Sequence, residues 1–289
     1  MAYIIHKTGE VEDKIRDLAQ NETLLMGDSR SQRLNGSLFS SQTAHFGSPA
    51  EHYYYTYHKL RRIVQVENHK LERVVLTLSI HNFSPMYNRL NNSDFAEGKT
   101  SLQRHLYFVP FDELIVGGKL KPWDLSGNSL LKSIYGGPYW GGHRISKHAN
   151  PNSSVIATTL NVQFTKSDDE PTFAYSNRVY ALKIDSLCKA EDISLFVVSS
   201  PYHKNYLSQI SDEYVTYFYD VIDEMQHAVH VDYLSEEPDV MWMSDANHLN
   251  ETGANLYSEK INDEVHSGLL VTNRKRKRRY SRARKNAKM

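Results

Sequence analysis

Three short apolar runs, each ending in a polar turn, most constrain what this chain can fold into. They are residues 23–26 (TLLM), 73–80 (RVVLTLSI) and 193–198 (ISLFVV). Runs of this length and composition are typical of buried strands. Apolar residues recur at helical spacing in four further segments, 51–67, 177–190, 211–228 and 251–265. Strands that alternate with amphipathic helices predict a mainly parallel sheet covered on both faces, a three-layer α/β/α fold.

A single domain with one long insertion accounts for the spacing of these elements. The 289 residues suffice for one α/β domain with a sizeable core. Residues 84–175 lack a clear period and are rich in glycine and aromatic residues, so we expect an insertion with small elements of its own. The domain is predicted to span residues 1–272, and the insertion is either a cover over a site or a purely structural excursion.

A basic block ends the chain. Residues 273–289 hold ten Lys and Arg and no acid, although the formal net charge of the whole chain is zero. Such a block is usually a solvated, disordered tail, and the alternatives are contact with nucleic acid, an anionic polymer or a membrane surface. No signal peptide or membrane span is predicted, so we expect a cytoplasmic protein, with association with the cell envelope as the alternative.

Cysteine and histidine do not mark a metal site. The single cysteine, Cys188, excludes an internal disulfide and a cysteine-rich zinc site. The fourteen histidines show no HExxH spacing. We therefore predict no metal and no cofactor.

Ser29 stands in a sharp turn, Gly27-Asp28-Ser29, directly after the first predicted strand. A serine hydroxyl is a poor nucleophile unless a nearby base takes its proton. Near the other end of the chain, Asp245 and His248 stand three residues apart, a spacing that lets the carboxylate hold one ring nitrogen while the other faces a serine. Together these residues predict a Ser-His-Asp triad. The alternatives are helix capping by Asp28 or Ser29 and a surface histidine near a helix start.

Two segments that carry these residues resemble a known family. LLMGDSRS at 24–31 and SDANHLNETGA at 244–254 are similar to the first and last signature blocks of SGNH/GDSL hydrolases, most closely those of bacterial polysaccharide- or envelope-associated members. The resemblance implies a flavodoxin-like sheet and a serine esterase. In that reading Ser29 is the nucleophile and His248, held by Asp245, is the general base.

The resemblance also implies an oxyanion hole. Its donors are the backbone N–H groups of Ser29 and Gly47 and the side-chain amide of Asn82. The segment around Asn82 departs from the family pattern, because it reads Ser-Ile-His-Asn where the family usually has Gly-x-Asn-Asp. The alternatives are an ordinary turn glycine at Gly47 and a strand-end cap at Asn82.

The expected activity is hydrolysis of a small O-acyl ester, with an acetyl group on a carbohydrate as the preferred substrate. His81, Tyr202 and His203 follow predicted strands and are candidates for substrate contact, with structural roles as the alternative. Two other functions use the same residues differently. One is an O-acyltransferase with the same site, and the other is a non-catalytic protein that binds a glycan or an anionic polymer.

Overall fold

A computed structural model describes residues 2–92, 94–116, 139–147, 151–234 and 236–266. The predicted basic tail at 273–289 lies outside the described residues, as do the last residues of the predicted domain.

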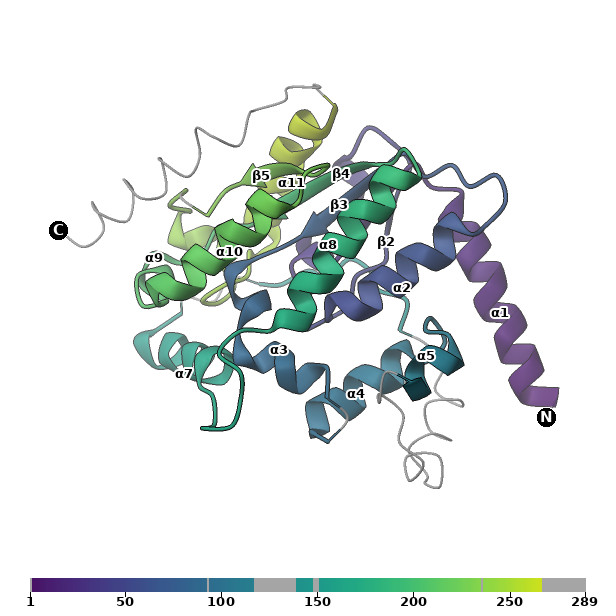
Figure 1. Ribbon diagram of the computed structural model, residues 1–289. Helices are drawn as coiled ribbons and strands as arrows, with labels where there is room; N and C mark the ends of the chain where they lie inside the picture. Colours follow the sequence, from purple (N-terminus) through teal and green to yellow (C-terminus); the bar gives the residue numbers. More distant parts are fainter. Residues whose placement is uncertain (1, 93, 117–138, 148–150, 235, 267–289) are drawn as a thin grey trace.

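A five-stranded parallel sheet forms the centre of the molecule (Figure 1). Its strands are β1 (Thr23–Met26), β2 (Thr43–His45), β3 (Arg73–Thr77), β4 (Ser194–Ser199) and β5 (Val229–Asp232). The spatial order is β2-β1-β3-β4-β5, and every neighbouring pair is parallel. This order confirms the predicted three-layer α/β/α, flavodoxin-like fold.

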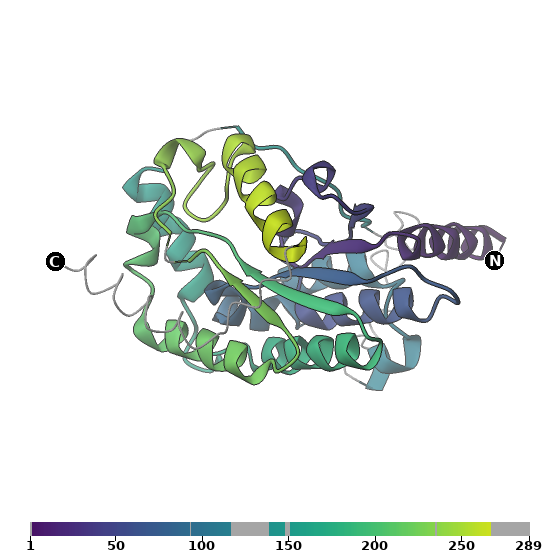
Figure 2. The ribbon, with the colours of Figure 1, turned by 90° about the horizontal axis from the view of Figure 1, so that it is seen from above.

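Helices cover both faces of the sheet (Figure 2). The main ones are α1 (Ala2–Ala19), α2 (Tyr53–Val64), α8 (Tyr175–Ala190), α10 (Asp212–Glu224) and α11 (Glu251–His266). The helices α2, α8 and α10 lie on one face and α11 lies on the other. Successive residues of β1 point to opposite faces: Leu24 and Met26 join the larger core cluster, and Leu25 joins the cluster under α11.

The predicted insertion contains elements of its own in its described part. These are the helices α3 (Pro85–Leu90), α4 (Ala96–His105), α5 (Phe111–Val116) and α7 (Ser153–Phe164). Elsewhere in the described residues the chain forms one further short helix, α9 (Lys204–Leu207), and 3-10 turns η1 (Ser31–Arg33), η2 (Gly36–Leu38), η3 (Ile80–Phe83) and η5 (Val240–Trp242). In the described ranges, no helix has the length and apolar character needed to cross a membrane.

Two predicted boundaries were wrong. The strand predicted over 73–80 ends at Thr77, because the chain turns into η3, where Asn82 Oδ1 accepts the Ser79 N–H and the Asn82 N–H donates to the Ser79 carbonyl. The helix predicted over 211–228 ends at Glu224, where Met225 takes an extended conformation before β5. Neither change moves the polar segments away from the carboxyl ends of the strands.

The order of the strands fixes where a site can form. From β1 the chain moves outward to β2 and then returns to β3 on the other side of β1. The loops after β1 and β3 therefore diverge and leave room between them at the carboxyl edge of the sheet. The turn that holds Ser29 follows β1, and the turn that holds Asn82 follows β3.

Candidate active site

The turn after β1 depends on Gly27. Its φ of 112° lies in the region that favours glycine. A Cβ at this position would lie 2.8 Å from the Thr77 carbonyl oxygen of the neighbouring strand. The Asp28 carboxylate accepts the N–H of Arg30 at 3.0 Å, which tightens the turn. Ser29 at the tip of this turn is half-buried, whereas Asp28 and Arg30 on either side of it are buried.

Ser29 and His248 are in hydrogen-bond contact. The Ser29 Oγ lies 2.6 Å from Nε2 of His248, although the two residues are 219 positions apart in the chain. The His248 side chain is 20% exposed, so the pair is open to solvent on one side. The structure thus brings together the two ends of the chain that the sequence pattern singled out.

Asp245 holds the other nitrogen of the ring. Nδ1 of His248 lies 3.0 and 2.9 Å from the two carboxylate oxygens, and Oδ1 also accepts the backbone N–H groups of Asn247 and His248. Burial raises the pKa of Asp245, but these hydrogen bonds lower it to about 2. Because the carboxylate can only accept, the ring proton sits on Nδ1 and leaves Nε2 as the acceptor that faces Ser29.

The segment that carries His248 is held rigidly on both sides. The Ser244 N–H donates to the His248 carbonyl at 2.9 Å. Asn250 donates through Nδ2 to the Met241 carbonyl at 2.6 Å and accepts the N–H of Gly253, which caps the start of α11. The imidazole therefore stands on a fixed turn directly before a helix.

Gly47 lies against the turn that holds Ser29, the nucleophile turn of the expected triad. It follows β2, and a Cβ built on it would lie 2.6 Å from the Gly27 carbonyl oxygen and 2.0 Å from Ser31 Oγ. The neighbouring Ser48 N–H donates to the same Gly27 carbonyl at 3.1 Å. Within the described part of the chain, the N–H groups of Ser29 and Gly47 have no hydrogen-bond partner. Both donors remain available to a bound oxygen.

The Asn82 amide is not available in the same way, which departs from the expectation. Asn82 is fully buried, and its Nδ2 donates to Asp28 at 3.0 Å and to the Tyr87 hydroxyl at 2.8 Å. Its Oδ1 accepts the Ser79 N–H and the Tyr53 hydroxyl. The side chain ties the β3 turn to the β1 turn, which is closer to the alternative of a structural cap.

Asp28, Arg30 and His81 form a buried charge network beneath Ser29. Nη1 of Arg30 lies 3.0 Å from Asp28 and 2.7 Å from Nε2 of His81, and the guanidinium stacks 5.0 Å from the centre of the Tyr202 ring. Burial raises the pKa of Asp28, but Arg30 and His81 bring it far below its ordinary value. Burial and then Arg30 lower the pKa of His81 to about 4, so the ring is neutral at pH 7.

The same network contains two of the three residues that were candidates for substrate contact. His81 is 3% and Tyr202 is 1% exposed, and the Tyr202 hydroxyl lies 3.2 Å from Nδ1 of His81. Both side chains are buried and contact Arg30 and each other, which fits the structural role given as the alternative. His203 is also buried; its N–H donates to the Ala246 carbonyl, and its Nδ1 accepts the N–H of Asn205. It supports the segment before His248.

A second buried network holds the loop that carries Gly47. The Glu51 carboxylate accepts from Ser48 at 2.6 Å and from Lys59 at 2.5 Å, and it lies 3.1 Å from Nε2 of His105. Burial raises the pKa of Glu51, but Lys59 and His105 lower it to about 2. Sequence reasoning missed both networks, because their members are far apart in the chain. A lysine and a glutamate on the apolar side of a predicted helix were the only local signal.

Part of the insertion borders the site. The Arg144 N–H donates to the Gln32 carbonyl at 2.8 Å, and the Glu251 N–H at the start of α11 donates to the Ser146 carbonyl at 3.0 Å. A Cβ on Gly141 would lie 2.7 Å from the Gly47 carbonyl oxygen. The segment 139–147 therefore runs from the Gly47 loop to α11, along the edge of the site.

The described residues contain no group of three or more His, Cys, Asp and Glu side chains that could hold a metal ion. No protein-family model and no curated protein matches the chain. The geometry itself is suited to nucleophilic chemistry: a half-buried hydroxyl, an imidazole oriented by a carboxylate, and two N–H groups that have no partner among the described residues.

Proposed function

We propose that this protein is a serine ester hydrolase in which Ser29, His248 and Asp245 act as a catalytic triad. The observation that carries the proposal is the unbroken hydrogen-bond chain from Ser29 Oγ through both nitrogens of His248 to Asp245. The ionised Asp245 carboxylate supports the proposal, because it can hold a proton on Nδ1 and so orient Nε2 toward Ser29.

In the first step, Ser29 Oγ attacks the carbonyl carbon of an ester while its proton moves to Nε2 of His248. Asp245 stabilises the imidazolium through the bond at Nδ1. The C–O bond to the leaving alcohol then breaks, and the alcohol takes the proton back from His248. This leaves an acyl group on Ser29.

The negative charge that develops on the carbonyl oxygen needs donors that are already in place. The Ser29 and Gly47 N–H groups fit this role, since neither has a partner in the described residues and Gly47 packs directly on the nucleophile turn. The tight contact with Gly27 keeps the Gly47 backbone close to Ser29.

In the second step, water attacks the acyl-enzyme with His248 as the base, and the acid and Ser29 are released. The small acyl group, acetyl on a carbohydrate, follows from the family resemblance and remains part of the proposal. None of the steps above requires a cofactor.

Covalent labelling tests the nucleophile. A fluorophosphonate probe should modify the folded protein at Ser29, as located by peptide mass spectrometry, because the reagent reacts only with an activated serine. Ser29→Ala should abolish labelling, and Asp245→Asn should slow it strongly by allowing the wrong ring tautomer. Ser40→Ala, which removes an exposed serine, is the matched control and should label as the wild type does. Labelling that persists in Ser29→Ala would refute the assignment.

A further inference from the structure

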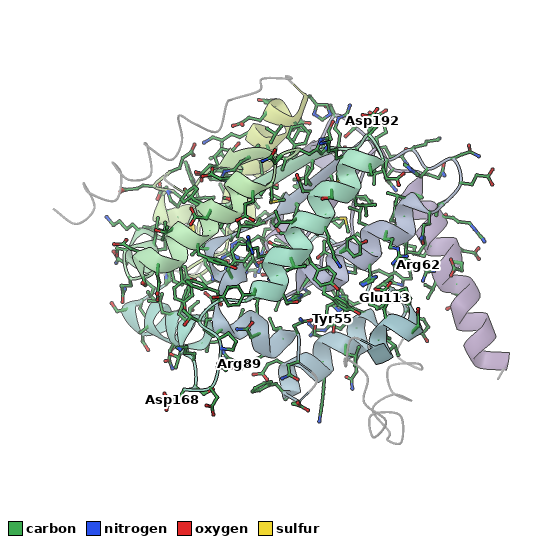
Figure 3. The ribbon with its side chains drawn as sticks, in the orientation of Figure 1. Tyr55, Arg62, Arg89, Glu113, Asp168 and Asp192 are labelled. Atoms are coloured by element: carbon green, nitrogen blue, oxygen red, sulfur yellow. The ribbon has the colours of Figure 1, made fainter. Side chains whose placement is uncertain are left out.

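Most arginines in the described part of the chain have a carboxylate partner. Seven of them lie within 4.0 Å of one, and they are Arg16, Arg30, Arg61, Arg62, Arg73, Arg89 and Arg178. Two of these, Arg62 on α2 and Arg89 on α3, are labelled in Figure 3. Pairing of this kind neutralises the guanidinium charge locally.

The other three described arginines, Arg33, Arg104 and Arg144, have no carboxylate within that distance among the described residues. They are not scattered over the surface. Arg33 ends the 3-10 turn η1, four residues after Ser29, and Arg144 lies in the segment 139–147 that borders the site. Arg104 is at the end of α4, and its backbone carbonyl accepts the N–H of Tyr139 from the same segment.

Hydrogen bonds of the Arg33 and Arg104 side chains tie these residues to the two sides of the site. Nη1 of Arg33 donates to the Arg144 carbonyl at 2.9 Å. Nη1 of Arg104 lies 3.4 Å from the Pro49 carbonyl, two residues after Gly47. The arginines therefore flank both the nucleophile turn and the loop with the second oxyanion donor.

The Arg33 side chain has donor capacity that the protein does not use. Its Nε is buried and has no hydrogen-bond partner among the described residues. Burial lowers the pKa of this guanidinium, the nearby Asp245 carboxylate raises it, and Arg144 lowers it. The Asp245 carboxylate offsets part of the cost of burying this cation beside a second one, and the open donor at Nε leaves a position for a further anion.

We propose that Arg33, Arg104 and Arg144 form an anion-binding rim, so that the ester cleaved at Ser29 carries a carboxylate or a phosphate near the reacting acyl group. Guanidinium groups suit both anions, because they offer paired donors in a fixed plane. Two acidic residues lie at the same edge, Asp245, whose charge acts on Arg33, and Glu251, whose N–H bonds to Ser146, and the three arginines outnumber them. The inference rests on the proposed esterase function and names its substrate class.

The direct test compares esters that differ only in charge. Wild type should hydrolyse 4-acetoxybenzoate with a higher kcat/KM than its neutral methyl ester, and 4-acetoxyphenyl phosphate tests phosphate in place of carboxylate. The ratio of anionic to neutral kcat/KM should fall about tenfold in Arg33→Gln and in Arg144→Gln, since a charged hydrogen bond is lost. Arg178→Gln on α8, an arginine paired with Glu224, is the matched control and should keep the wild-type ratio.

Measuring the ratio of anionic to neutral kcat/KM at increasing salt concentration provides a second test. The preference for the anionic esters should shrink as ionic strength rises, because screening weakens attraction between exposed charges. A wild-type ratio near one for both anions, or a ratio that neither Arg33→Gln nor Arg144→Gln changes, would overturn the anion-binding rim.

Binding to Ser29→Ala separates this inference from the esterase proposal, because it needs no turnover. Calorimetry with this protein should show tighter binding of 4-acetoxybenzoate than of its methyl ester, and adding Arg144→Gln should remove the difference. If the preference appears but wild type hydrolyses none of the esters, the rim stands and the esterase fails. Hydrolysis without any preference for an anionic ester would refute the anion-binding rim and support the esterase function.

Discussion

Ser29 Oγ lies 2.6 Å from Nε2 of His248, and this contact joins the turn after the first strand to the turn before the last described helix. The parallel sheet makes it possible, because β1 and β5 end at the same edge of the sheet, and the segment after β5 brings His248 back to the turn after β1. The contact is thus a product of topology, and the local turns on each side only set its angle and distance.

Gly47 should tolerate no side chain. In Gly47→Ala the new Cβ would meet the Gly27 carbonyl at 2.6 Å, and backbone at that position cannot move aside cheaply. We expect a loss of about 1–3 kcal/mol in the free energy of unfolding and a reduced kcat in the protein that still folds. Urea unfolding and ester hydrolysis measure the two effects. Gly9→Ala, where nothing lies within 4 Å of the new Cβ, is the control, and equal stability of the two variants would contradict the close packing.

Asn82 should behave as a structural residue more than as an oxyanion donor. Asn82→Ala removes bonds to Asp28 and Tyr87 and leaves buried polar atoms unpaired, so we expect a loss of about 1–3 kcal/mol in unfolding free energy. In the folded fraction, kcat should fall by less than the roughly hundredfold or greater loss typical of a missing oxyanion donor. A larger fall in kcat with unchanged stability would mean that the amide turns toward the substrate.

Lys59 should be needed for folding. It is fully buried and donates to Glu51 at 2.5 Å and to the Phe46 carbonyl at 2.9 Å. Lys59→Met leaves the Glu51 carboxylate buried without its cation, which typically costs about 3–5 kcal/mol. Lys70→Met, on an exposed lysine, should stay within about 0.5 kcal/mol of wild type in urea unfolding. Similar midpoints for the two variants would show that the network is not stabilising the loop at Gly47.

Acid should destabilise the fold before the carboxylates titrate. Burial lowers the pKa of His45, His58 and His81 from the ordinary histidine value of 6.5 to about 4 in the folded protein. The stabilising contribution of these three histidines is complete above about pH 6.5 and is lost as pH falls toward 4. In this range the unfolded chain binds protons at the histidines and the folded protein does not. Each such proton contributes a slope of about 1.4 kcal/mol per pH unit.

Urea unfolding between pH 7 and pH 4.5 measures this slope. His45→Gln should make it shallower, since one proton no longer takes part. A free energy of unfolding that stays constant or rises as the pH falls from 7 to 4.5 would contradict the neutral, buried state of the three rings.

The inner strands were predictable and the edge strands were not. The runs that became β1, β3 and β4 are mostly buried, and each holds consecutive apolar residues. β2 has only three half-buried residues, and β5 includes a histidine and an aspartate, so neither has a clear periodic signal. In α1, Val11, Ile15 and Leu18 pack into the core at helical spacing, a signal that sequence reasoning passed over.

The triad could be found from sequence because each part is local. Ser29 stands at a strand end, and Asp245 and His248 share one turn. The pairing of Arg30 with His81 could not, since 51 positions separate the two residues and only the β1–β3 contact brings them together. The same holds for Asn82, whose amide was expected at the substrate and instead joins Asp28 to Tyr87.

The most direct test of the triad is hydrolysis of p-nitrophenyl acetate by the wild type, Ser29→Ala and His248→Ala, with all three shown to be folded by circular dichroism. The account predicts turnover by wild type and a fall in kcat of about a thousandfold or more in each variant, since triad members act as one unit. An equal rate in all three proteins would contradict the assignment of Ser29 and His248 as nucleophile and base.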